Sequence, residues 1–133
     1  MKPIVFKGSA VALVTPMRED GSVNQQVLEE LLIFHLTHHT DAIVVAGTTG
    51  ESATLSDEEH LQLIQFCVEK IDGRLPVIAG VGSNNTAHAV HLSKEAERLG
   101  ADALAKSEQV RANLLRMISH DLRTFWKRQQ FAG

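Results

Sequence analysis

Short apolar runs alternate with amphipathic stretches through the first hundred residues. The apolar runs predict strands at about 10–14, 42–46, 76–80 and 102–105. The stretches between them carry apolar residues at helical spacing. Alternation of this kind is typical of successive βα units on a parallel sheet. The sequence therefore predicts an α/β fold with about three βα units and a fourth strand.

Capping signals indicate where the three helices begin and end. Ser22-Val23-Asn24-Gln25 offers a capping box before the first helix, and Ser56-Asp57-Glu58-Glu59 offers another before the second. Asp72-Gly73 predicts the end of the second helix. Asn85 is placed to cap the third helix, and Gly100 stands where a helix commonly ends in the left-handed conformation.

Composition indicates an ordinary globular protein. Hydrophobic residues make up 44% of the chain, and no apolar run approaches the roughly 20 residues that cross a bilayer, so we expect no membrane segment. Lys7 and Thr15-Pro16 interrupt the apolar stretch near the amino terminus, which argues against a secretion signal and predicts a cytoplasmic protein. The one cysteine, Cys67, can form neither an internal disulfide nor a cysteine-cluster zinc site.

Charge divides the chain near residue 105. Residues 1–105 hold seven Lys/Arg and fourteen Asp/Glu residues, a net charge of −7, whereas residues 106–133 hold six basic and two acidic residues, a net charge of +4. The basic segment carries no nucleic-acid recognition motif, so we expect a solvated face and no nucleic-acid partner. We therefore predict a 1–105 domain followed by a distinct 106–133 tail.

The tail carries an apolar stripe. Its members recur at intervals of three or four residues and are Val110, Leu114, Ile118, Leu122 and Phe125. This spacing predicts a carboxyl-terminal amphipathic helix that packs on a partner helix or a core.

Polar residues follow three of the predicted strands. They are Thr15-Pro16, the segment 47–52 and the segment 80–84, at the strand end where parallel barrels present reactive groups. Glycines let backbone N–H groups approach a ligand, and the adjacent hydroxyls of Thr48 and Thr49 can donate to a carboxylate and pass a proton. The pattern suits a small oxo acid, although a Gly-Thr-Thr-Gly turn can also serve only as a turn and helix cap.

The combination of these motifs is more specific than any one of them. It comprises Gly8-Ser9 through Val14-Thr15-Pro16, Gly47-Thr48-Thr49-Gly50-Glu51-Ser52-Ala53-Thr54-Leu55, Glu59-His60, and Pro76-Val77-Ile78-Ala79-Gly80-Val81-Gly82 with Asn84 and Thr86. From about residue 4 to 104 the chain closely resembles the amino-terminal part of the 4-hydroxy-tetrahydrodipicolinate synthases, in the dihydrodipicolinate synthase/N-acetylneuraminate lyase family. The resemblance implies a (βα)8 TIM barrel, usually tetrameric. It also implies a lysine Schiff base with pyruvate, condensation with aspartate semialdehyde in lysine biosynthesis through diaminopimelate, and no external cofactor.

The resemblance also implies roles for individual residues. Thr48 matches the first threonine of the family's pair, which belongs to a proton relay with tyrosines. Thr49 matches the second, which helps to hold the pyruvate carboxylate. The residues that fall where some members bind feedback lysine are Ser52, Ala53, Asn84 and His88, and the position of His88 is acidic in several of those members.

The resemblance ends before the family's main catalytic groups. A Schiff-base enzyme needs a nucleophilic lysine and a general acid/base, which the family supplies on later elements together with tyrosines and an arginine. The chain contains no tyrosine, and Lys106 has no evident base beside it. We therefore expect a truncated barrel that binds a pyruvate-class substrate only when completed. Four strands cannot close a barrel, so we also expect self-association through the exposed edge.

Residues 107–124 resemble the phosphoacceptor helix of sensor histidine kinases. Ser119-His120-Asp121-Leu122-Arg123-Thr124 is the distinctive core, followed by Phe125 where the family has proline. When an imidazole accepts a phosphoryl group, a neighbouring carboxylate can take the proton that the ring loses. Asp121 is placed to do so for His120. A phosphoacceptor or interaction fragment and a non-functional fusion fragment are thus the two alternatives to an enzyme.

Other histidines also recur at helical spacing. His35, His38 and His39 form one group, and His88 and His91 form a pair. Helical spacing can bring two imidazoles together in each group, but it places no third ligand beside them, so we expect no metal site.

Overall fold

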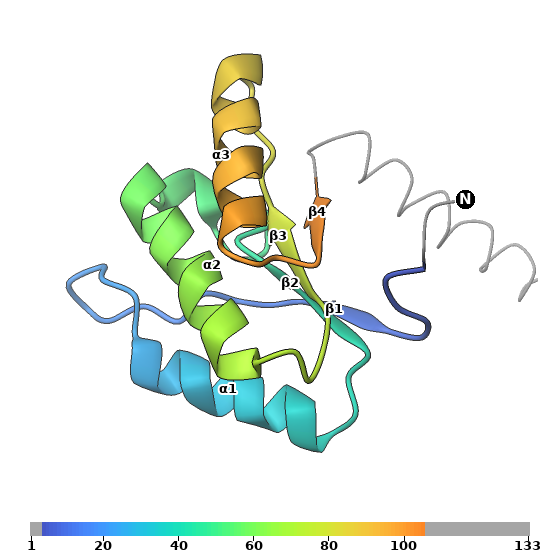
Figure 1. Cartoon of the computed structure of the whole chain (residues 1–133). Helices are drawn as coiled ribbons and strands as arrows, with labels where there is room; N and C mark the ends of the chain where they lie inside the picture. Colours follow the sequence, from blue (N-terminus) through green and yellow to red (C-terminus); the bar gives the residue numbers. More distant parts are fainter. Residues whose placement is uncertain (1–3, 106–133) are drawn as a thin grey trace, which may run out of the picture.

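Strands and helices alternate along the part of the chain that the structure describes. A computed structural model describes residues 4–105 of the 133-residue chain. In chain order the elements are β1 (Ala10–Ala12), α1 (Gln25–Thr37), β2 (Ala42–Val45), the 3-10 helix η1 (Ser52–Thr54), α2 (Asp57–Ile71), β3 (Val77–Gly80), α3 (Thr86–Arg98) and β4 (Ala103–Ala105) (Figure 1). The predicted three βα units and fourth strand are confirmed, with the strands one to two residues shorter than predicted. The predicted helical tail lies outside the described residues.

The four strands form one parallel sheet in the order β1-β2-β3-β4. Ile43 pairs with Val77 across β2 and β3, and Ile78 pairs with Ala103 across β3 and β4. Helices α1, α2 and α3 lie on the same side of the sheet (Figure 1), as expected for crossovers of a single hand. Because the strands are parallel, the loops that follow them all emerge at one edge of the sheet.

The core lies between this sheet and the three helices. Ile43 and Val45 of β2 point toward the helices and are at most 1% exposed. The helical side chains that meet the sheet are completely or almost completely buried; they include Leu28 and Leu32 of α1, Ile64 and Cys67 of α2, and Leu92 and Ala96 of α3. Burial raises the pKa of the Cys67 thiol to about 12, so this cysteine is a packing residue rather than a nucleophile.

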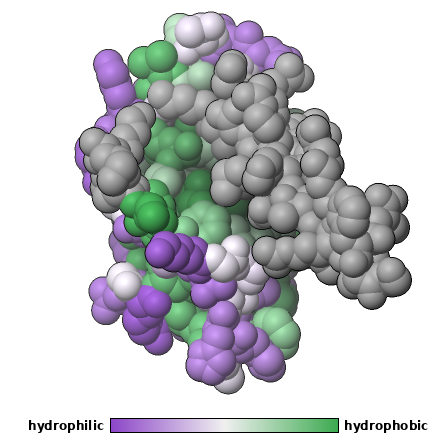
Figure 2. Space-filling view, turned by 90° about the vertical axis from the view of Figure 1, so that its right-hand side faces the viewer, coloured by the Kyte–Doolittle hydropathy of each residue, from purple (hydrophilic) through white to green (hydrophobic). Residues whose placement is uncertain are grey.

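The opposite surface of the sheet carries no helix of the described chain. Side chains alternate across a strand, so those that point away from the helices are Ala10, Ala12, Val14, Ala42, Val44, Ile78, Ala103 and Ala105, here called the open face. Val14 is 52% exposed, and Ala10 and Ala12 are also exposed. Figure 2 shows hydrophobic residues of the described part gathered in a hollow on this side, with hydrophilic residues around it.

Two of the predicted helix caps are confirmed. In α2 the Ser56 hydroxyl accepts a hydrogen bond from the Glu59 N–H (3.2 Å), while the Glu59 carboxylate accepts one from the Ser56 N–H (2.8 Å). In α3 the side-chain oxygen of Asn85 accepts from the His88 N–H (3.2 Å). Gly100 follows α3 with φ +97°, the left-handed conformation that the sequence predicted.

The predicted capping box of α1 is wrong. Asn24 caps this helix by accepting from the Val27 N–H (3.2 Å), and the Ser22 hydroxyl instead donates to Asp20 (2.6 Å). The reason is tertiary, since the Asn24 N–H donates to the Pro16 carbonyl (2.8 Å) and holds the chain extended up to this residue. Helix α1 therefore begins later than its local sequence indicated.

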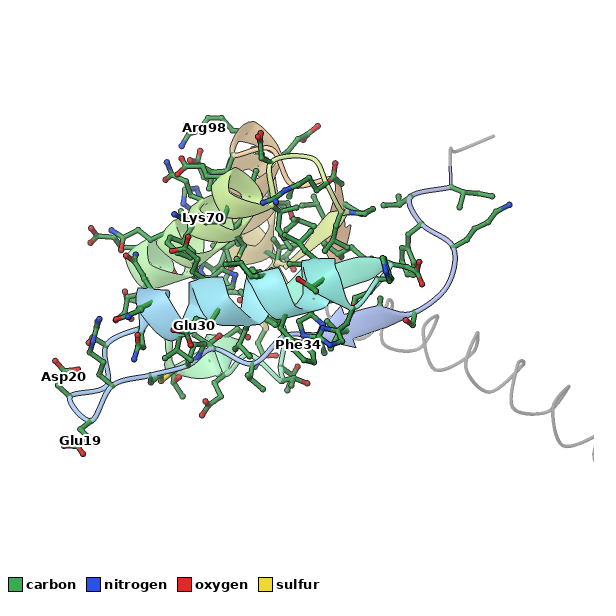
Figure 3. All side chains as sticks on the ribbon, turned by 90° about the horizontal axis from the view of Figure 1, so that it is seen from below. Glu19, Asp20, Glu30, Phe34, Lys70 and Arg98 are labelled. Carbon is green, nitrogen blue, oxygen red and sulfur yellow. The ribbon has the colours of Figure 1, made fainter. Side chains whose placement is uncertain are left out.

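Helix α1 leaves apolar side chains on its outer surface. Phe34 is 52% exposed and stacks on His38, with ring centroids 4.1 Å apart. Figure 3 shows Glu30 and Phe34 along this helix. Within residues 4–105, no helix combines the length and apolar character needed to cross a membrane.

Candidate functional site

The loop that follows β2, residues 46–51, presents the predicted threonine pair and is here called the threonine loop. After Val45 the backbone turns sharply, with Ala46 at φ +55°, and the Glu51 N–H donates to the Thr48 carbonyl (3.0 Å) to close the turn. Thr48 and Thr49 are exposed at its tip. Among residues 4–105 neither threonine hydroxyl has a hydrogen-bond partner.

Thr15 fixes the threonine loop to the end of β1. Thr15 is 5% exposed, and its hydroxyl donates to the Gly50 carbonyl at 2.6 Å. Gly50 is packed closely, since a Cβ there would lie 3.1 Å from both the Leu13 carbonyl oxygen and the Thr15 hydroxyl. The sequence placed Thr15 at a polar strand end, but the hydrogen bond to Gly50 joins residues 35 positions apart and was not predicted.

Gly80 brings the end of β3 against the start of the same loop. A Cβ at Gly80 would lie 2.4 Å from the Ala46 carbonyl oxygen and 2.8 Å from the Gly47 nitrogen. Only glycine fits this approach, because real Cβ atoms do not come so close to backbone. The threonine loop is therefore packed between the ends of the two strands that neighbour β2.

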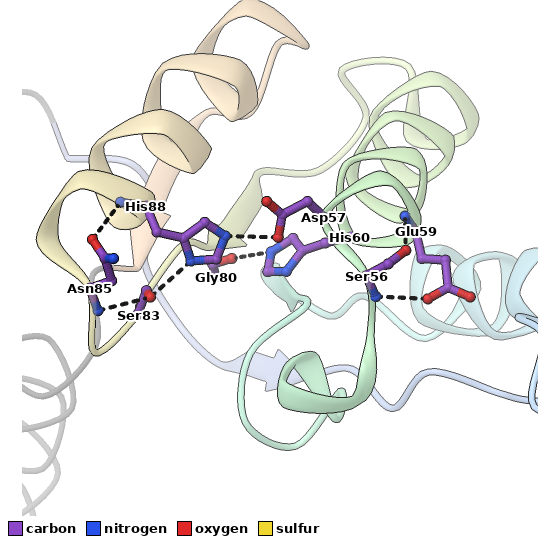
Figure 4. Close-up of polar contacts among 8 residues, drawn as sticks. All are labelled: Ser56, Asp57, Glu59, His60, Gly80, Ser83, Asn85 and His88. Atoms are coloured by element: carbon purple, nitrogen blue, oxygen red, sulfur yellow. Dashed lines mark hydrogen bonds and ion pairs between the residues drawn. The ribbon is translucent and has the colours of Figure 1, made fainter.

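His60 holds Gly80 in place from the helix side. This histidine is 4% exposed, and its Nε2 lies 2.7 Å from the Gly80 carbonyl oxygen (Figure 4). A carbonyl can only accept, so Nε2 carries the proton. Burial lowers the pKa of His60, and this effect outweighs the Gly80 carbonyl and the Asp57 charge, which both raise it. The lowered pKa keeps the ring neutral near pH 7.

The sequence contained a signal for this histidine. His60 belongs to the same helical stripe as Ile64, Cys67 and Ile71, all of them buried in α2. A histidine on a core-facing stripe needs a hydrogen-bond partner. Sequence reasoning identified Glu59-His60 as part of the family pattern but gave the histidine no structural role.

The residues predicted at a regulatory ligand site lie at the same edge of the sheet. Ser52 and Ala53 form the start of η1, and Asn84 is exposed in the loop after β3. His88 stands in the first turn of α3. The structure thus brings these four positions to the edge that carries the threonine loop.

His88 links the beginnings of α2 and α3 through both ring nitrogens. Its Nδ1 lies 2.8 Å from the Ser83 hydroxyl, and its Nε2 lies 2.8 Å from a carboxylate oxygen of Asp57 (Figure 4). Asp57 is in the first turn of α2, where a negative charge is favourable. The sequence did not predict this pair, because nothing local connects residues 31 positions apart.

None of the described lysines lies at the threonine loop. Lys7 precedes β1, and Lys94 is exposed on α3. Lys70 is at the far end of α2, 43% exposed, and its Nζ lies 3.1 Å from a Glu29 carboxylate oxygen (Figure 3). None is buried, as a lysine nucleophile of lowered pKa would be. In residues 4–105 no group of three or more His, Cys, Asp or Glu side chains could hold a metal ion.

This parallel sheet, with its one-sided helices and its hydroxyl pair after β2, is part of a TIM barrel. The model of the dihydrodipicolinate synthetase family matches residues 5–107, and the chain belongs to this family. The match ends before the predicted phosphoacceptor His120 and its neighbour Asp121, which lie outside the described residues and remain predictions.

Individual relatives agree with this assignment. A 4-hydroxy-tetrahydrodipicolinate synthase from Caldicellulosiruptor saccharolyticus is 59% identical over 100 residues, which are 75% of this chain and 34% of that protein. The structure of the chloride-inhibited dihydrodipicolinate synthase from Acinetobacter baumannii complexed with pyruvate superposes with a TM-score of 0.72 at 49% identity, over 73% of this chain and 33% of that one. The enzyme from Cyanidioschyzon merolae with lysine bound gives a TM-score of 0.72 at 40% identity, over 75% and 34%. The chain thus spans about a third of the length of the relatives it matches.

Proposed function

We propose that residues 4–105 supply the carboxylate-binding part of a 4-hydroxy-tetrahydrodipicolinate synthase site. In this proposal the Thr49 hydroxyl, with backbone N–H groups of its loop, holds the carboxylate of pyruvate, and Thr48 passes a proton during condensation with aspartate semialdehyde. The observation that carries it is an exposed hydroxyl pair on a loop fixed by Thr15 and Gly80. A loop held in this way presents its donors without reorganisation, which is what tight binding of a small anion requires.

The lysine for Schiff-base chemistry must come from outside residues 4–105. Lys7, Lys70 and Lys94 are exposed and distant in the fold from the threonine loop. We propose that turnover occurs only when further βα units complete the barrel and bring a buried lysine opposite Thr49. The relatives, with about three times the matched length, support this reading.

Complementation by a second polypeptide tests the proposal. The full chain is mixed with the part of the Caldicellulosiruptor saccharolyticus enzyme that it does not match, and condensation of pyruvate with aspartate semialdehyde is followed. Thr49→Val should raise the KM for pyruvate about 10- to 100-fold, the effect of one lost hydrogen bond to a charged group. Thr48→Val should lower kcat about 100-fold with little change in KM.

Thr37→Val serves as the matched control for both variants. Thr37 is exposed in the last turn of α1, and its hydroxyl donates only to the Ile33 carbonyl (2.8 Å). Both kinetic constants should stay at the wild-type value. Equal kinetics for wild type, Thr48→Val and Thr49→Val would reject the assigned roles.

An effector site at Ser52, Ala53, Asn84 and His88 is a further part of the proposal. Support comes from their common position at the carboxyl edge of the sheet. A ligand amine would have to compete with His88 for the Asp57 carboxylate (2.8 Å). Lysine titrated calorimetrically into wild type and His88→Glu should bind the variant more tightly; equal binding argues against an ammonium ligand here.

A second candidate function rests on the sequence of the tail. In the resemblance to histidine kinases, His120 matches the histidine that accepts the phosphoryl group, and Asp121 is placed to take the proton that the ring loses. In this alternative the chain accepts phosphate from a kinase partner, and the label should be acid-labile and absent from His120→Ala. Failure of this assay together with the complementation assay would favour the third reading, a fusion fragment without function.

A further inference from the structure

The open face is an apolar sheet surface without a covering layer in the described chain. Ala12 and Val14 of the β1 side are exposed, and Val44 and Ile78 in the middle of the sheet are half-buried, whereas their strand neighbours Ile43 and Val77 are at most 2% exposed. A sheet stable in water normally covers both faces when both are apolar. This surface therefore needs a partner.

The chain itself continues from the border of this surface. The last described residue, Ala105, belongs to β4, an edge strand, and 28 residues follow it. The strands of the sheet are spaced by about 4.8 Å, so four of them span roughly 15 Å. A helix over residues 107–125 would be about 28 Å long. The tail is thus long enough to turn at residue 106 and cross from β4 back to β1.

The tail and the open face also match in chemistry and in shape. The stripe of the tail presents large apolar side chains at helical spacing, namely Val110, Leu114, Ile118, Leu122 and Phe125. The open face is lined mainly by alanine, which lets a helix with large side chains approach closely. The charges are opposite, with a net of −7 on residues 1–105 and +4 on residues 106–133.

We propose that residues 107–125 fold back onto the open face of the same chain and cover it. The tail then supplies the layer that this face lacks, so the cover comes from the same chain. Under the proposed function, the units that complete the barrel would occupy the same face, so the tail would have to leave it. The labelling experiment below uses the chain alone, so its failure is distinguishable from failure of the complementation assay. A second copy of the chain is the competing occupant.

Selective labelling of a cysteine on the open face tests the proposal in the full chain. Ala12→Cys places a thiol on this face, and Gln65→Cys places one on the exposed side of α2. The rate of thiol modification is measured at each position by peptide mass spectrometry. The buried native Cys67, with its pKa of about 12, reports in the same sample whether the fold has opened.

We expect the thiol at position 12 to be protected from modification only while the stripe of the tail is intact. The thiol introduced by Ala12→Cys should react at least about tenfold more slowly than the same thiol in a chain that also carries Ile118→Glu, because a negative charge in the stripe detaches the tail. Asn113→Glu, a charge outside the stripe, should leave that thiol protected, and the thiol of Gln65→Cys should react at one rate throughout. If Cys67 becomes labelled with Ile118→Glu, the comparison is made with Ile118→Ala, which weakens the stripe without adding a charge.

Two results would overturn the proposal. One is equal reactivity of the thiol at position 12 with and without the stripe substitution. The other is protection that appears only as concentration rises, together with a dimer in light scattering, because a second copy would then be the cover. Protection of this thiol at all protein concentrations, in a chain that stays monomeric, supports the tail as the cover of the open face.

Discussion

The imidazole Nε2 of His60 lies 2.7 Å from the carbonyl oxygen of Gly80, and this hydrogen bond joins α2 to the end of β3. Gly80 in turn contacts the backbone at Ala46, where the chain leaves β2 for the threonine loop. A histidine in the helix layer thus supports the threonine loop through the end of a neighbouring strand. The loop geometry depends on packing as much as on its own sequence.

Loss of the His60 side chain should destabilise the fold. His60→Ala leaves the buried Gly80 carbonyl without its donor and opens a cavity, so we expect a loss of about 2–4 kcal/mol in the free energy of unfolding. His60→Gln keeps a donor and should lose less. Urea unfolding gives both values, and His91→Ala, an exposed position on α3, is the control that should change little. A loss below about 0.5 kcal/mol for His60→Ala would show that the bond contributes nothing.

Stability should also depend on pH through this residue. Burial lowers the pKa of His60 below its ordinary value of 6.5 in the folded state. Between the folded and unfolded pKa values the unfolded chain binds more protons, so the free energy of unfolding rises with pH. The contribution of His60 to the free energy of unfolding is complete above about pH 6.5 and is lost as the pH falls below this value. Urea unfolding at about pH 7.5 and about pH 5.5 should show this decrease in wild type and a smaller one in His60→Gln; an identical decrease in both would assign it to other groups.

The two glycines nearest to Ala46 should respond differently to a methyl group. Gly80→Ala would place a Cβ 2.4 Å from the Ala46 carbonyl oxygen, and we expect a loss of about 3 kcal/mol. At Gly47 the nearest atom to a new Cβ is a Val44 side-chain carbon at 3.5 Å, an ordinary contact. Gly47→Ala should therefore change stability by less than about 1 kcal/mol. Thermal unfolding of the two variants compares them directly, and similar melting temperatures would contradict the close approach of β3 to this loop.

The fold was largely predictable because its signals are local. Apolar periodicity placed the strands, and the capping box at Ser56 and Glu59 placed the start of α2. What escaped prediction depends on contacts between distant residues. The hydrogen bond from Asn24 to Pro16 delays α1, and Gly80 packs against Ala46 where the backbone takes φ +55°. Neither effect has a counterpart in the neighbouring sequence.

The residues of the candidate site could be predicted from the sequence, but the contacts that hold them in place could not. The threonine pair was identified from its sequence position, and the structure presents both side chains at the loop tip. The bond from Thr15 to Gly50 and the pairing of His88 with Asp57 span 35 and 31 positions. Sequence reasoning on one chain has no access to such pairs until the elements are packed.

The corrected cap of α1 gives a simple stability test. Asn24→Ala removes the side chain that accepts from the Val27 N–H and should cost about 1 kcal/mol. Ser22→Ala removes only an exposed hydrogen bond to Asp20 and should cost less than about 0.5 kcal/mol. Urea unfolding of the two variants decides between the caps, and the reverse order would restore Ser22 as the cap.

Trapping of a Schiff base most directly tests the central claim, that this chain contributes the carboxylate site while the reacting amine lies outside residues 4–105. The complemented mixture is incubated with pyruvate, the lysine amine condenses with the keto carbon with loss of water, and borohydride reduces the imine to a stable secondary amine. Peptide mapping should locate the adduct on the added polypeptide, with a yield lowered by Thr49→Val and unchanged by Thr37→Val. An adduct on Lys7, Lys70 or Lys94 of this chain, formed without any added polypeptide, would contradict the account.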